Sequence, residues 1–274
     1  MKIKLAENYG FCFGVKRAIK MAENENGAAT YGPLIHNNKE IDRLKMNFDV
    51  SLKNDLSDFE RGDKVIIRTH GIEKDELKVL NDKKIDIVDA TCPYVTKPQQ
   101  IVEDMSLEGY DIVIFGDDEH PEIKGVKSYA QGNVYVVLTQ EELEVIPLKE
   151  KIAVVAQTTR KIENYLALVD FMIRNYKEVR VFNTICNATF ENQDAARELA
   201  KEADVMIVIG GKNSSNTKQL LSIAKLTCPD SYLIEGPEDL ELSWFNDKKL
   251  CGITAGASTP DWIITQITQQ IENI

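Results

Sequence analysis

The chain has 274 residues, of which 43% are hydrophobic, and a chain of this size can bury roughly three quarters of its unfolded surface. These values exclude an intrinsically disordered protein. The 33 basic and 44 acidic residues give a net charge of −11, which repels nucleic-acid phosphates, so we expect no nucleic-acid partner. A small phosphorylated ligand stays compatible with this charge because helix N-termini and hydroxyl groups bind phosphate.

Nothing in the sequence predicts a membrane span. Uninterrupted apolar runs such as Val205 to Ile209 reach only five residues, whereas a bilayer requires ~20. The opening residues lack the apolar core of a signal peptide, so we expect a cytoplasmic protein with no membrane partner. In that reducing compartment the five cysteines are expected to be metal ligands, nucleophiles or packed thiols rather than disulfides.

Short runs rich in valine and isoleucine alternate with helical patterns along the whole chain. The runs predict strands at 65–67, 85–88, 112–115, 152–155, 179–182 and 205–209, and a further short strand is expected at 2–5. Apolar residues spaced by three and four predict amphipathic helices between them, with stripes at Val15, Ala18, Ile19 and Ala22 and at Leu166, Val169 and Ile173. This alternation is typical of α/β folds with parallel sheets.

Three cysteines divide the chain into blocks of similar length. Cys12 and Cys92 are 80 residues apart, Cys92 and Cys186 are 94 apart, and 88 residues follow Cys186. We therefore predict α/β lobes at 13–93, 94–187 and 188–274, joined by an N-terminal strand segment at 1–12, in a pseudo-threefold arrangement around a central cavity. Each lobe would direct one thiolate to the centre. A two-domain α/β protein is the alternative, since the spacing is not a detected repeat.

Unusual polar residues fall repeatedly between a predicted strand and the following helix. They are His36, His70, His120, Glu122, Thr158, Ser214, Ser215, Asn216 and Ser258. Ligands bind at the carboxyl ends of parallel strands, so these loops can line one pocket. A lone histidine in a loop is usually a surface residue, but all three histidines of the chain lie in such loops.

Two of these loops suit phosphate oxygens. Residues 210–217 read Gly-Gly-Lys-Asn-Ser-Ser-Asn-Thr, which lacks the residue order of an ATPase phosphate loop. The hydroxyls, amides and backbone N–H groups at a helix start nevertheless favour a phosphate ligand, with a plain helix cap as the alternative. The loop at Ser258, before a helix from about Trp262, has the same character. Two such loops can hold a diphosphate, helped by donating histidines.

The cysteine spacing favours an iron–sulfur cluster over structural zinc. Structural zinc sites usually use close pairs such as Cys-x-x-Cys, which the sequence lacks. Three thiolates around a cuboidal cluster would leave one iron open to substrate. Any single cysteine can instead be a packed hydrophobe. Cys251 fits that interpretation, and Cys228, before Pro229, fits a turn without a further role.

Nine segments together resemble the LytB/IspH family of 4-hydroxy-3-methylbut-2-enyl diphosphate reductases. In chain order they are Phe-Cys12-Phe-Gly-Val-Lys-Arg-Ala, Gly-Pro-Leu-Ile-His36-Asn, Arg-Thr-His70-Gly, Asp-Ala-Thr-Cys92-Pro-Tyr-Val, His120-Pro-Glu122, Gln-Thr158-Thr, Cys186-Asn-Ala-Thr, Lys-Asn-Ser214-Ser215-Asn216-Thr and Ala-Gly-Ala-Ser258. The resemblance runs from residue 12 to about 260. Each motif is moderately specific, and nine in order are highly specific.

The resemblance implies a three-lobed enzyme that holds a [4Fe-4S] cluster through Cys12, Cys92 and Cys186. The implied reaction of isoprenoid precursor synthesis, in the non-mevalonate pathway, is a two-electron reductive dehydroxylation that gives isopentenyl and dimethylallyl diphosphate. Glu122 would supply a proton, and Thr158 would orient the substrate hydroxyl or a nearby water. The implied diphosphate contacts are His36, His70, His120, Ser214, Ser215, Asn216 and Ser258.

The electrons of such a reaction must come from outside the chain. No Gly-x-Gly-x-x-Gly nicotinamide fingerprint occurs in the sequence, so we expect an external ferredoxin or flavodoxin system as partner.

Two rival hypotheses for the function stay open. A cluster-bearing redox sensor would have no use for a proton donor at Glu122, and a zinc hydrolase would use the histidines and one cysteine.

Overall fold

The computed structural model describes the whole chain, residues 1–274. The strands are β1 Lys2–Leu5, β2 Ala29–Tyr31, β3 Ser51–Lys53, β4 Lys64–Ile67, β5 Asp86–Asp89, β6 Asp111–Phe115, β7 Val134–Val137, β8 Lys151–Ala156, β9 Glu178–Val181, β10 Val205–Ile209, β11 Ser231–Ile234 and β12 Leu250–Ala255. The α-helices are α1 Phe13–Glu23, α2 Asn38–Phe48, α3 Lys74–Asp82, α4 Pro93–Leu107, α5 Pro121–Lys127, α6 Gln140–Glu144, α7 Ile162–Asn175, α8 Asn187–Glu202, α9 Ser215–Ala224 and α10 Asp261–Glu272. Short 3-10 helices are η1 Leu56–Asp58, η2 Pro237–Asp239 and η3 Leu242–Phe245. None of the helices has the length and hydrophobicity of a membrane span.

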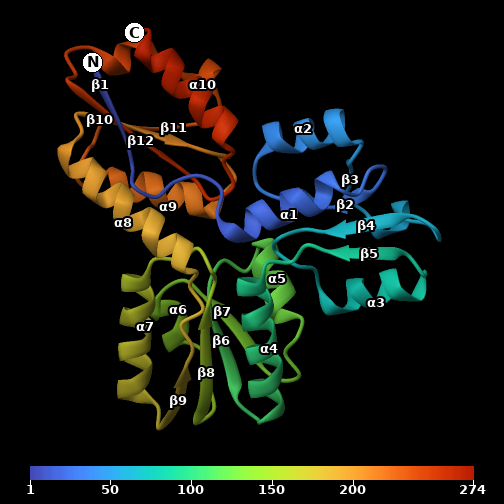
Figure 1. Ribbon diagram of the computed structural model, residues 1–274. Helices are drawn as coiled ribbons and strands as arrows, with labels where there is room; N and C mark the ends of the chain where they lie inside the picture. Colours follow the sequence, from blue (N-terminus) through green and yellow to red (C-terminus); the bar gives the residue numbers. More distant parts are fainter. The chain divides into compact units, whose positions relative to one another are not determined.

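The strands form three sheets of four strands each (Figure 1). Their strand orders are β1-β12-β10-β11, β3-β2-β4-β5 and β7-β6-β8-β9, and all neighbouring strands are parallel. Parallel neighbours need crossover connections, which most of the helices supply. The predicted α/β class with small parallel sheets is confirmed. The pseudo-threefold arrangement around a central cavity stays a prediction.

Contacts divide the chain into two compact units. The first unit comprises Met1–Lys16, Ile35–Arg43 and Asn187–Ile274, and the second comprises Arg17–Leu34 and Leu44–Cys186. The sheet β1-β12-β10-β11 lies in the first unit, and the other two sheets lie in the second. The predicted lobe boundaries at 13–93, 94–187 and 188–274 stay a prediction.

Helices cover both faces of the sheet β7-β6-β8-β9. Ile112 and Ile114 of β6 join a buried cluster with side chains of α4 and α5. Phe115 lies against Tyr165 of α7, with ring centroids 5.9 Å apart. The Tyr165 hydroxyl also donates to the Val154 carbonyl at 3.1 Å. All five residues of β6 are buried. Burial from both sides explains why they are apolar or, where polar, have polar partners.

One helix presents a different face to the core from the predicted one. In α7, Val169 is buried as predicted, but Leu166 is 56% exposed and Ile173 is 59% exposed, so the predicted stripe is wrong at these two residues. The Tyr165 hydroxyl donates to the carbonyls of Val154 and Phe182, which holds Tyr165 rather than Leu166 against the sheet. The buried residues of α7 are Tyr165, Leu168, Val169 and Met172.

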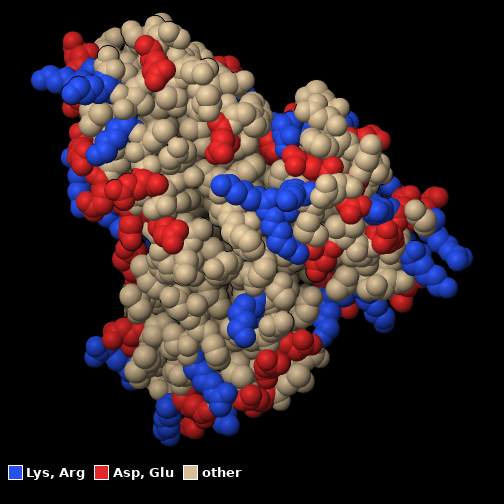
Figure 2. All heavy atoms as spheres, in the orientation of Figure 1, with Lys and Arg blue, Asp and Glu red and all other residues tan.

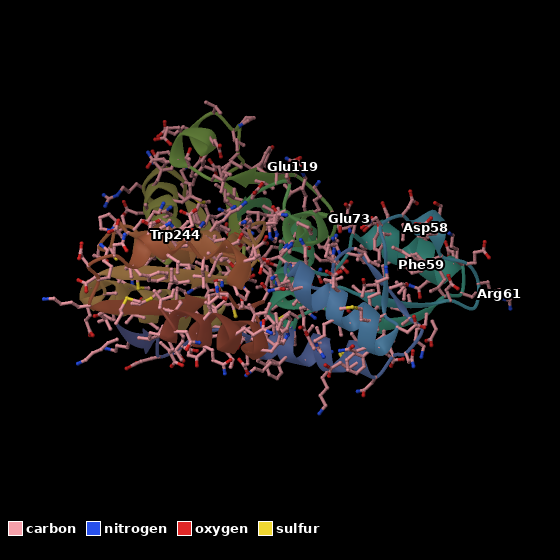
Figure 3. All side chains as sticks on the ribbon, turned by 90° about the horizontal axis from the view of Figure 1, so that it is seen from above. Asp58, Phe59, Arg61, Glu73, Glu119 and Trp244 are labelled. Carbon is pink, nitrogen blue, oxygen red and sulfur yellow. The ribbon has the colours of Figure 1, made fainter.

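All seven predicted strands are present, each within one residue at either end. The sequence analysis did not predict β2, β3, β7, β11 and β12. Strands β2 and β3 have three residues each, which is too short for a periodicity. The loop before β4 adds to the hydrophobic core of their sheet. In this loop lies the buried Phe59 (Figure 3), whose ring centroid is 6.2 Å from that of Tyr31. In β12, Gly252 interrupts the apolar run.

Candidate active site

In each of the three sheets, a cysteine follows an edge strand and the other predicted site residues follow the central strands, at the carboxyl ends. A cysteine follows an edge strand in each sheet: Cys12 follows β1, Cys92 follows β5 and Cys186 follows β9. The other predicted site residues follow central strands. His36 and His70 follow β2 and β4, His120 with Glu122 and Thr158 follow β6 and β8, and Ser214 to Asn216 and Ser258 follow β10 and β12. The predicted position between a strand and the next helix is confirmed for His36, His70, His120, Thr158, Ser214 and Ser258. Glu122, Ser215 and Asn216 lie instead in the first turn of α5 or α9.

The three cysteines share one local geometry. Each immediately precedes a helix, which is α1, α4 or α8. Each backbone N–H donates to a carbonyl in the loop after the neighbouring central strand: Cys12 to Ala257 at 3.2 Å, Cys92 to Thr69 at 3.0 Å and Cys186 to Thr158 at 2.9 Å. None of the three forms a disulfide, and all three are partly exposed. The backbone is therefore fixed by the sheet while the sulfur stays accessible to a ligand.

This donor set fits an iron–sulfur cluster. The partial positive charge of a helix N-terminus is compatible with the negative charge of an iron–sulfur cluster and its sulfur ligands. Cys228 and Cys251 differ, because both are free but buried in hydrophobic clusters. Burial raises the pKa of the Cys251 thiol to about 12. The expectation that Cys251 is a packed hydrophobe is confirmed. Cys228 is buried in the otherwise mostly exposed turn between α9 and β11.

Glu122 is a buried carboxyl at the start of α5, only 2% exposed. Burial raises its pKa, while hydrogen bonds from Thr158 and the charge of Arg160 act in the opposite direction. The Thr158 N–H donates to Oε1 at 2.7 Å, and the Thr158 hydroxyl donates to Oε2 at 2.6 Å. Because burial dominates, Glu122 keeps its proton to higher pH than an exposed glutamate.

The other acidic side chains of this loop face solvent. Asp117, Asp118 and Glu119 are exposed. Glu119, labelled in Figure 3, accepts a hydrogen bond from Lys124 at 2.8 Å, and Asp118 accepts one from Lys127 at 2.7 Å. Among the acidic side chains of this loop, only Glu122 is buried.

Thr158 connects the acid to a cysteine loop. Its carbonyl accepts the Cys186 N–H, and its own N–H and hydroxyl donate to Glu122. Behind it, the Gln157 amide oxygen accepts from the Asp117 N–H and from Arg160 Nε, each at 3.0 Å. These bonds give the acid one defined position beside the strand ends of β6 and β8.

The rings of His70 and His120 lie together in the second unit. Their centroids are 5.5 Å apart with an interplanar angle of 74°. His120 is the N-cap of α5, and its Nδ1 accepts the Glu122 N–H at 3.2 Å. An accepting Nδ1 carries no proton, so in the neutral ring Nε2 bears it and is a donor. Gly71, at φ +73°, brings this loop so close to Gln99 that a Cβ would lie 2.8 Å from its side-chain nitrogen.

In the first unit, the start of α9 contains a buried side-chain amide without a hydrogen-bond partner in the protein. Ser214 caps the helix, with Oγ accepting the Thr217 N–H at 3.3 Å. Asn216 is 4% exposed, and neither its Nδ2 nor its Oδ1 has a hydrogen-bond partner in the structure. A buried amide without partners costs ~1–3 kcal/mol. This cost is characteristic of a group that is satisfied by a bound ligand.

The His36 segment belongs to the same unit as Ser214 and Ser258, although it follows β2 in sequence. The Ser258 hydroxyl donates to the His36 carbonyl at 3.4 Å. A Cβ on Gly211 would lie 2.2 Å from that carbonyl oxygen, so only glycine allows this approach. The structure therefore gathers His36, Ser214, Asn216 and Ser258 in one unit.

A buried carboxylate fastens the His36 segment to α10. Glu40 is 1% exposed and receives two-pronged hydrogen bonds from Arg43, the shortest at 2.7 Å. The indole Nε1–H of Trp262 donates to Glu40 Oε2 at 2.9 Å. Asn37 caps α2 by accepting the Glu40 N–H at 3.1 Å. The sequence analysis missed these residues because 222 positions separate Glu40 from Trp262.

A comparison with protein-family models gives one match. The model described as LytB protein covers residues 3–272, which is nearly the entire chain. The chain belongs to this family. The resemblance seen in the sequence motifs is thereby confirmed for the chain as a whole.

Two similar proteins share one name. A protein of Sulfurimonas denitrificans is 64% identical over 273 residues, covering 100% of this chain and 99% of that protein. One of Campylobacter concisus is 63% identical and covers 100% of both. Both are called 4-hydroxy-3-methylbut-2-enyl diphosphate reductase.

Solved structures agree with the LytB fold. One is described as (E)-4-hydroxy-3-methyl-but-2-enyl diphosphate reductase, the terminal enzyme of the non-mevalonate pathway. It is 44% identical with a TM-score of 0.73, covering 100% of this chain and 99% of its own. A reductase from Plasmodium falciparum is 26% identical with a TM-score of 0.92, covering 99% of this chain and 87% of its own.

In this LytB protein, the variant Trp262→Phe is expected to lower the free energy of unfolding by about 1.5 kcal/mol, because it removes a hydrogen bond to a buried charged group. Anaerobic urea unfolding measures the loss. The matched control is Trp244→Phe, since Trp244 stacks on Tyr232 with centroids 4.0 Å apart and loses the same ring area. Equal losses in both variants would show that the bond to Glu40 contributes nothing.

Proposed function

We propose that this chain is an iron–sulfur reductase that converts 4-hydroxy-3-methylbut-2-enyl diphosphate into isopentenyl and dimethylallyl diphosphate. The observation that carries the proposal is the buried acid Glu122, bound through Thr158 to the loop of Cys186. A proton donor placed beside a cysteine loop is what a reductive dehydroxylation needs. A redox sensor has no use for such a donor, and a hydrolase built on zinc has no use for three cysteines.

The proposed cluster ligands are Cys12, Cys92 and Cys186. They are the partly exposed cysteines of the chain, and each lies at the start of a helix. When bound, a [4Fe-4S] cluster with one iron not held by cysteine would supply electrons and a Lewis acid for the substrate hydroxyl. The protein contributes the positions of the three thiolates.

The proposed substrate ligands in the first unit are His36, Ser214, Ser215, Asn216 and Ser258. In the second unit they are His70, His120 and Thr158. The first set combines hydroxyl and amide groups with the N-terminus of α9, whose partial positive charge favours a phosphate oxygen. His120 adds an Nε2–H donor. A diphosphate held in this way fixes the distant hydroxyl-bearing carbon, so remote binding orients the reacting end.

The proposed proton donor is Glu122. The substrate loses its C–O bond and takes up two electrons and two protons, and the products are one alkene diphosphate and one water. Glu122 holds a proton on a carboxyl oxygen that Thr158 orients. Delivery of a proton to either end of the allylic system gives the two products. The remaining proton leaves with the hydroxyl oxygen as water.

Asn216 supplies a test of the diphosphate contacts. We expect Asn216→Leu to weaken binding of inorganic pyrophosphate by at least ~10-fold and to raise the free energy of unfolding by ~1 kcal/mol, because an unpartnered buried amide is removed. Calorimetric titration and urea unfolding measure the two effects. The control is Asn213→Leu, an exposed neighbour in the same loop. Unchanged pyrophosphate affinity in Asn216→Leu would remove this residue from the binding site.

The direct test of the reaction is an anaerobic assay. Iron-loaded protein is mixed with 4-hydroxy-3-methylbut-2-enyl diphosphate and dithionite-reduced methyl viologen, and products are separated by chromatography. We expect dye oxidation with formation of both alkene diphosphates, and none in iron-free protein. Unchanged substrate in the presence of iron-loaded protein and reduced dye would refute the proposed function.

A further inference from the structure

Helix α1 carries an exposed stripe of one aromatic and two cationic side chains. Phe13, Lys16 and Lys20 are all exposed, and Phe13 is 66% exposed. Their spacing of three and seven residues places them on one face of the helix. The first turn of α1 contains no acidic residue. We call Phe13, Lys16 and Lys20 the α1 stripe.

This stripe is basic, whereas the protein as a whole has a net charge of −11. Many other lysines are neutralised by carboxylates, for example Lys64 by Glu25 at 2.7 Å. Lys16 and Lys20 form no salt bridge in the structure. Figure 2 shows basic side chains gathered where Figure 1 draws α1. The stripe is therefore a local positive surface with an apolar residue at its end.

The α1 stripe begins next to one proposed cluster ligand. Phe13 directly follows Cys12, and the Lys16 N–H donates to the Cys12 carbonyl at 2.9 Å. On the same helix, the Arg17 guanidinium donates to the carbonyls of Thr91 at 3.2 Å and Asp89 at 3.4 Å. Asp89 is the last residue of β5, and Thr91 lies in the loop between β5 and Cys92. The helix thus contacts or adjoins the backbone of two cysteine loops.

We propose that the α1 stripe is the docking surface for an acidic one-electron carrier protein. The proposal rests on the proposed function, in which two electrons and two protons enter for each water released. A carrier would be oxidised by one electron at each encounter, so two encounters supply one turnover. The chain has no nicotinamide-binding motif that could replace the carrier.

Charge explains why this surface fits such a partner. An acidic carrier is repelled by most of a protein with 44 acidic and 33 basic residues. A local cluster of unneutralised lysines selects one approach orientation and accelerates the encounter. Phe13 supplies the apolar contact that interface centres commonly contain. Encounters on the stripe would bring the carrier next to Cys12.

The test measures binding and two kinds of activity. A flavodoxin with a strongly acidic surface is titrated against the iron-loaded protein by calorimetry at about 0.02 and 0.15 M salt, since screening shortens the Debye length to ~8 Å at the higher value. We expect the double variant Lys16→Glu/Lys20→Glu to raise the Kd for flavodoxin at least ~10-fold at low salt and to lose most of the salt dependence.

The control is Lys78→Glu/Lys225→Glu, which changes the net charge equally, from −11 to −11 − 4 = −15. Both lysines are exposed, on α3 and at the end of α9. We expect this control to bind flavodoxin within about 2–3-fold of wild type. An equal loss of binding in both double variants, or none in the α1 variant, or no salt-sensitive binding by wild type, would overturn the docking proposal.

Activity with reduced methyl viologen separates the docking proposal from the proposed function. This small cationic dye does not need an acidic-protein docking surface. We expect Lys16→Glu/Lys20→Glu to keep dye-driven turnover while kcat/KM for reduced flavodoxin falls at least ~10-fold. A loss of dye-driven turnover by the same factor would contradict a docking role. Failure of wild type with the dye would instead refute the proposed function.

Discussion

Replacing Cys12, Cys92 or Cys186 by serine is expected to remove the iron and to lower turnover at least ~100-fold. Even replacing a residue that only supports a metal ligand lowers metal affinity or activity by about 10–100-fold. A serine hydroxyl is also a poor ligand for an iron–sulfur centre. Iron and sulfide content, with absorbance near ~400 nm, measure the cluster after anaerobic purification.

The controls are Cys228→Ala and Cys251→Ala. Cys251 lies in β12 with a fully buried side chain, and alanine removes the sulfur without burying a hydroxyl. We expect both controls to keep iron and turnover. Full iron content in Cys186→Ser would contradict the ligand assignment, whatever its activity.

Glu122→Gln is expected to keep its iron and to bind substrate, but to turn over at least ~100-fold more slowly, because general acids contribute 10²–10⁴-fold. The glutamine amide has nearly the volume of the carboxyl and can still accept from Thr158, so the loop should keep its conformation. Single-turnover kinetics with reduced dye measure the protonation step. Near-normal turnover in this variant would exclude Glu122 as the proton donor.

Turnover and stability are both expected to depend on pH, and the pKa of Glu122 sets the direction of each dependence. Burial raises the pKa of Glu122 in the folded protein, so the acid form persists above its ordinary pH range. Turnover should fall as pH rises through that raised pKa. The folded protein also binds this proton more tightly than the unfolded chain, so part of its stability should be lost over the same rise in pH.

The raised pKa of Glu122 also predicts a difference between the stability of Glu122→Gln and that of wild type, which can be measured without an activity assay. The variant has no proton to lose at this position, so its stability should fall less than that of wild type as pH increases. Urea unfolding at several pH values measures the difference. Parallel stability curves for the two proteins would show that Glu122 does not have a raised pKa.

The sequence predicted those features that depend on local chemistry. The run that forms β10 was placed at the correct residues because continuous apolar strands are typical of buried parallel sheets. The histidines and hydroxyl-rich segments were placed in the correct loops because a strand and a helix flank each one. Cys251 was separated from the proposed ligands because it lies within an apolar run.

Features that depend on distant contacts were not predictable. No local signal assigns residues 35–43 to the same unit as β10 and β12, since this requires the close approach of Gly211 to the His36 carbonyl. The orientation of α7 depends on Tyr165, whose hydroxyl bonds across to Val154 and Phe182 carbonyls. From the sequence alone, Glu40 resembles any acidic residue of an exposed helix, because only the structure shows its hydrogen bond with Trp262.

The most direct measurement is Mössbauer spectroscopy of the protein reconstituted with ⁵⁷Fe, recorded anaerobically with and without the hydroxylated diphosphate. With three cysteine ligands and one iron open to substrate, we expect one iron in four to change its isomer shift and quadrupole splitting when the diphosphate is added, while the other three keep theirs. Four irons that all ignore the substrate, or a protein that binds zinc in place of iron, would contradict the proposed centre.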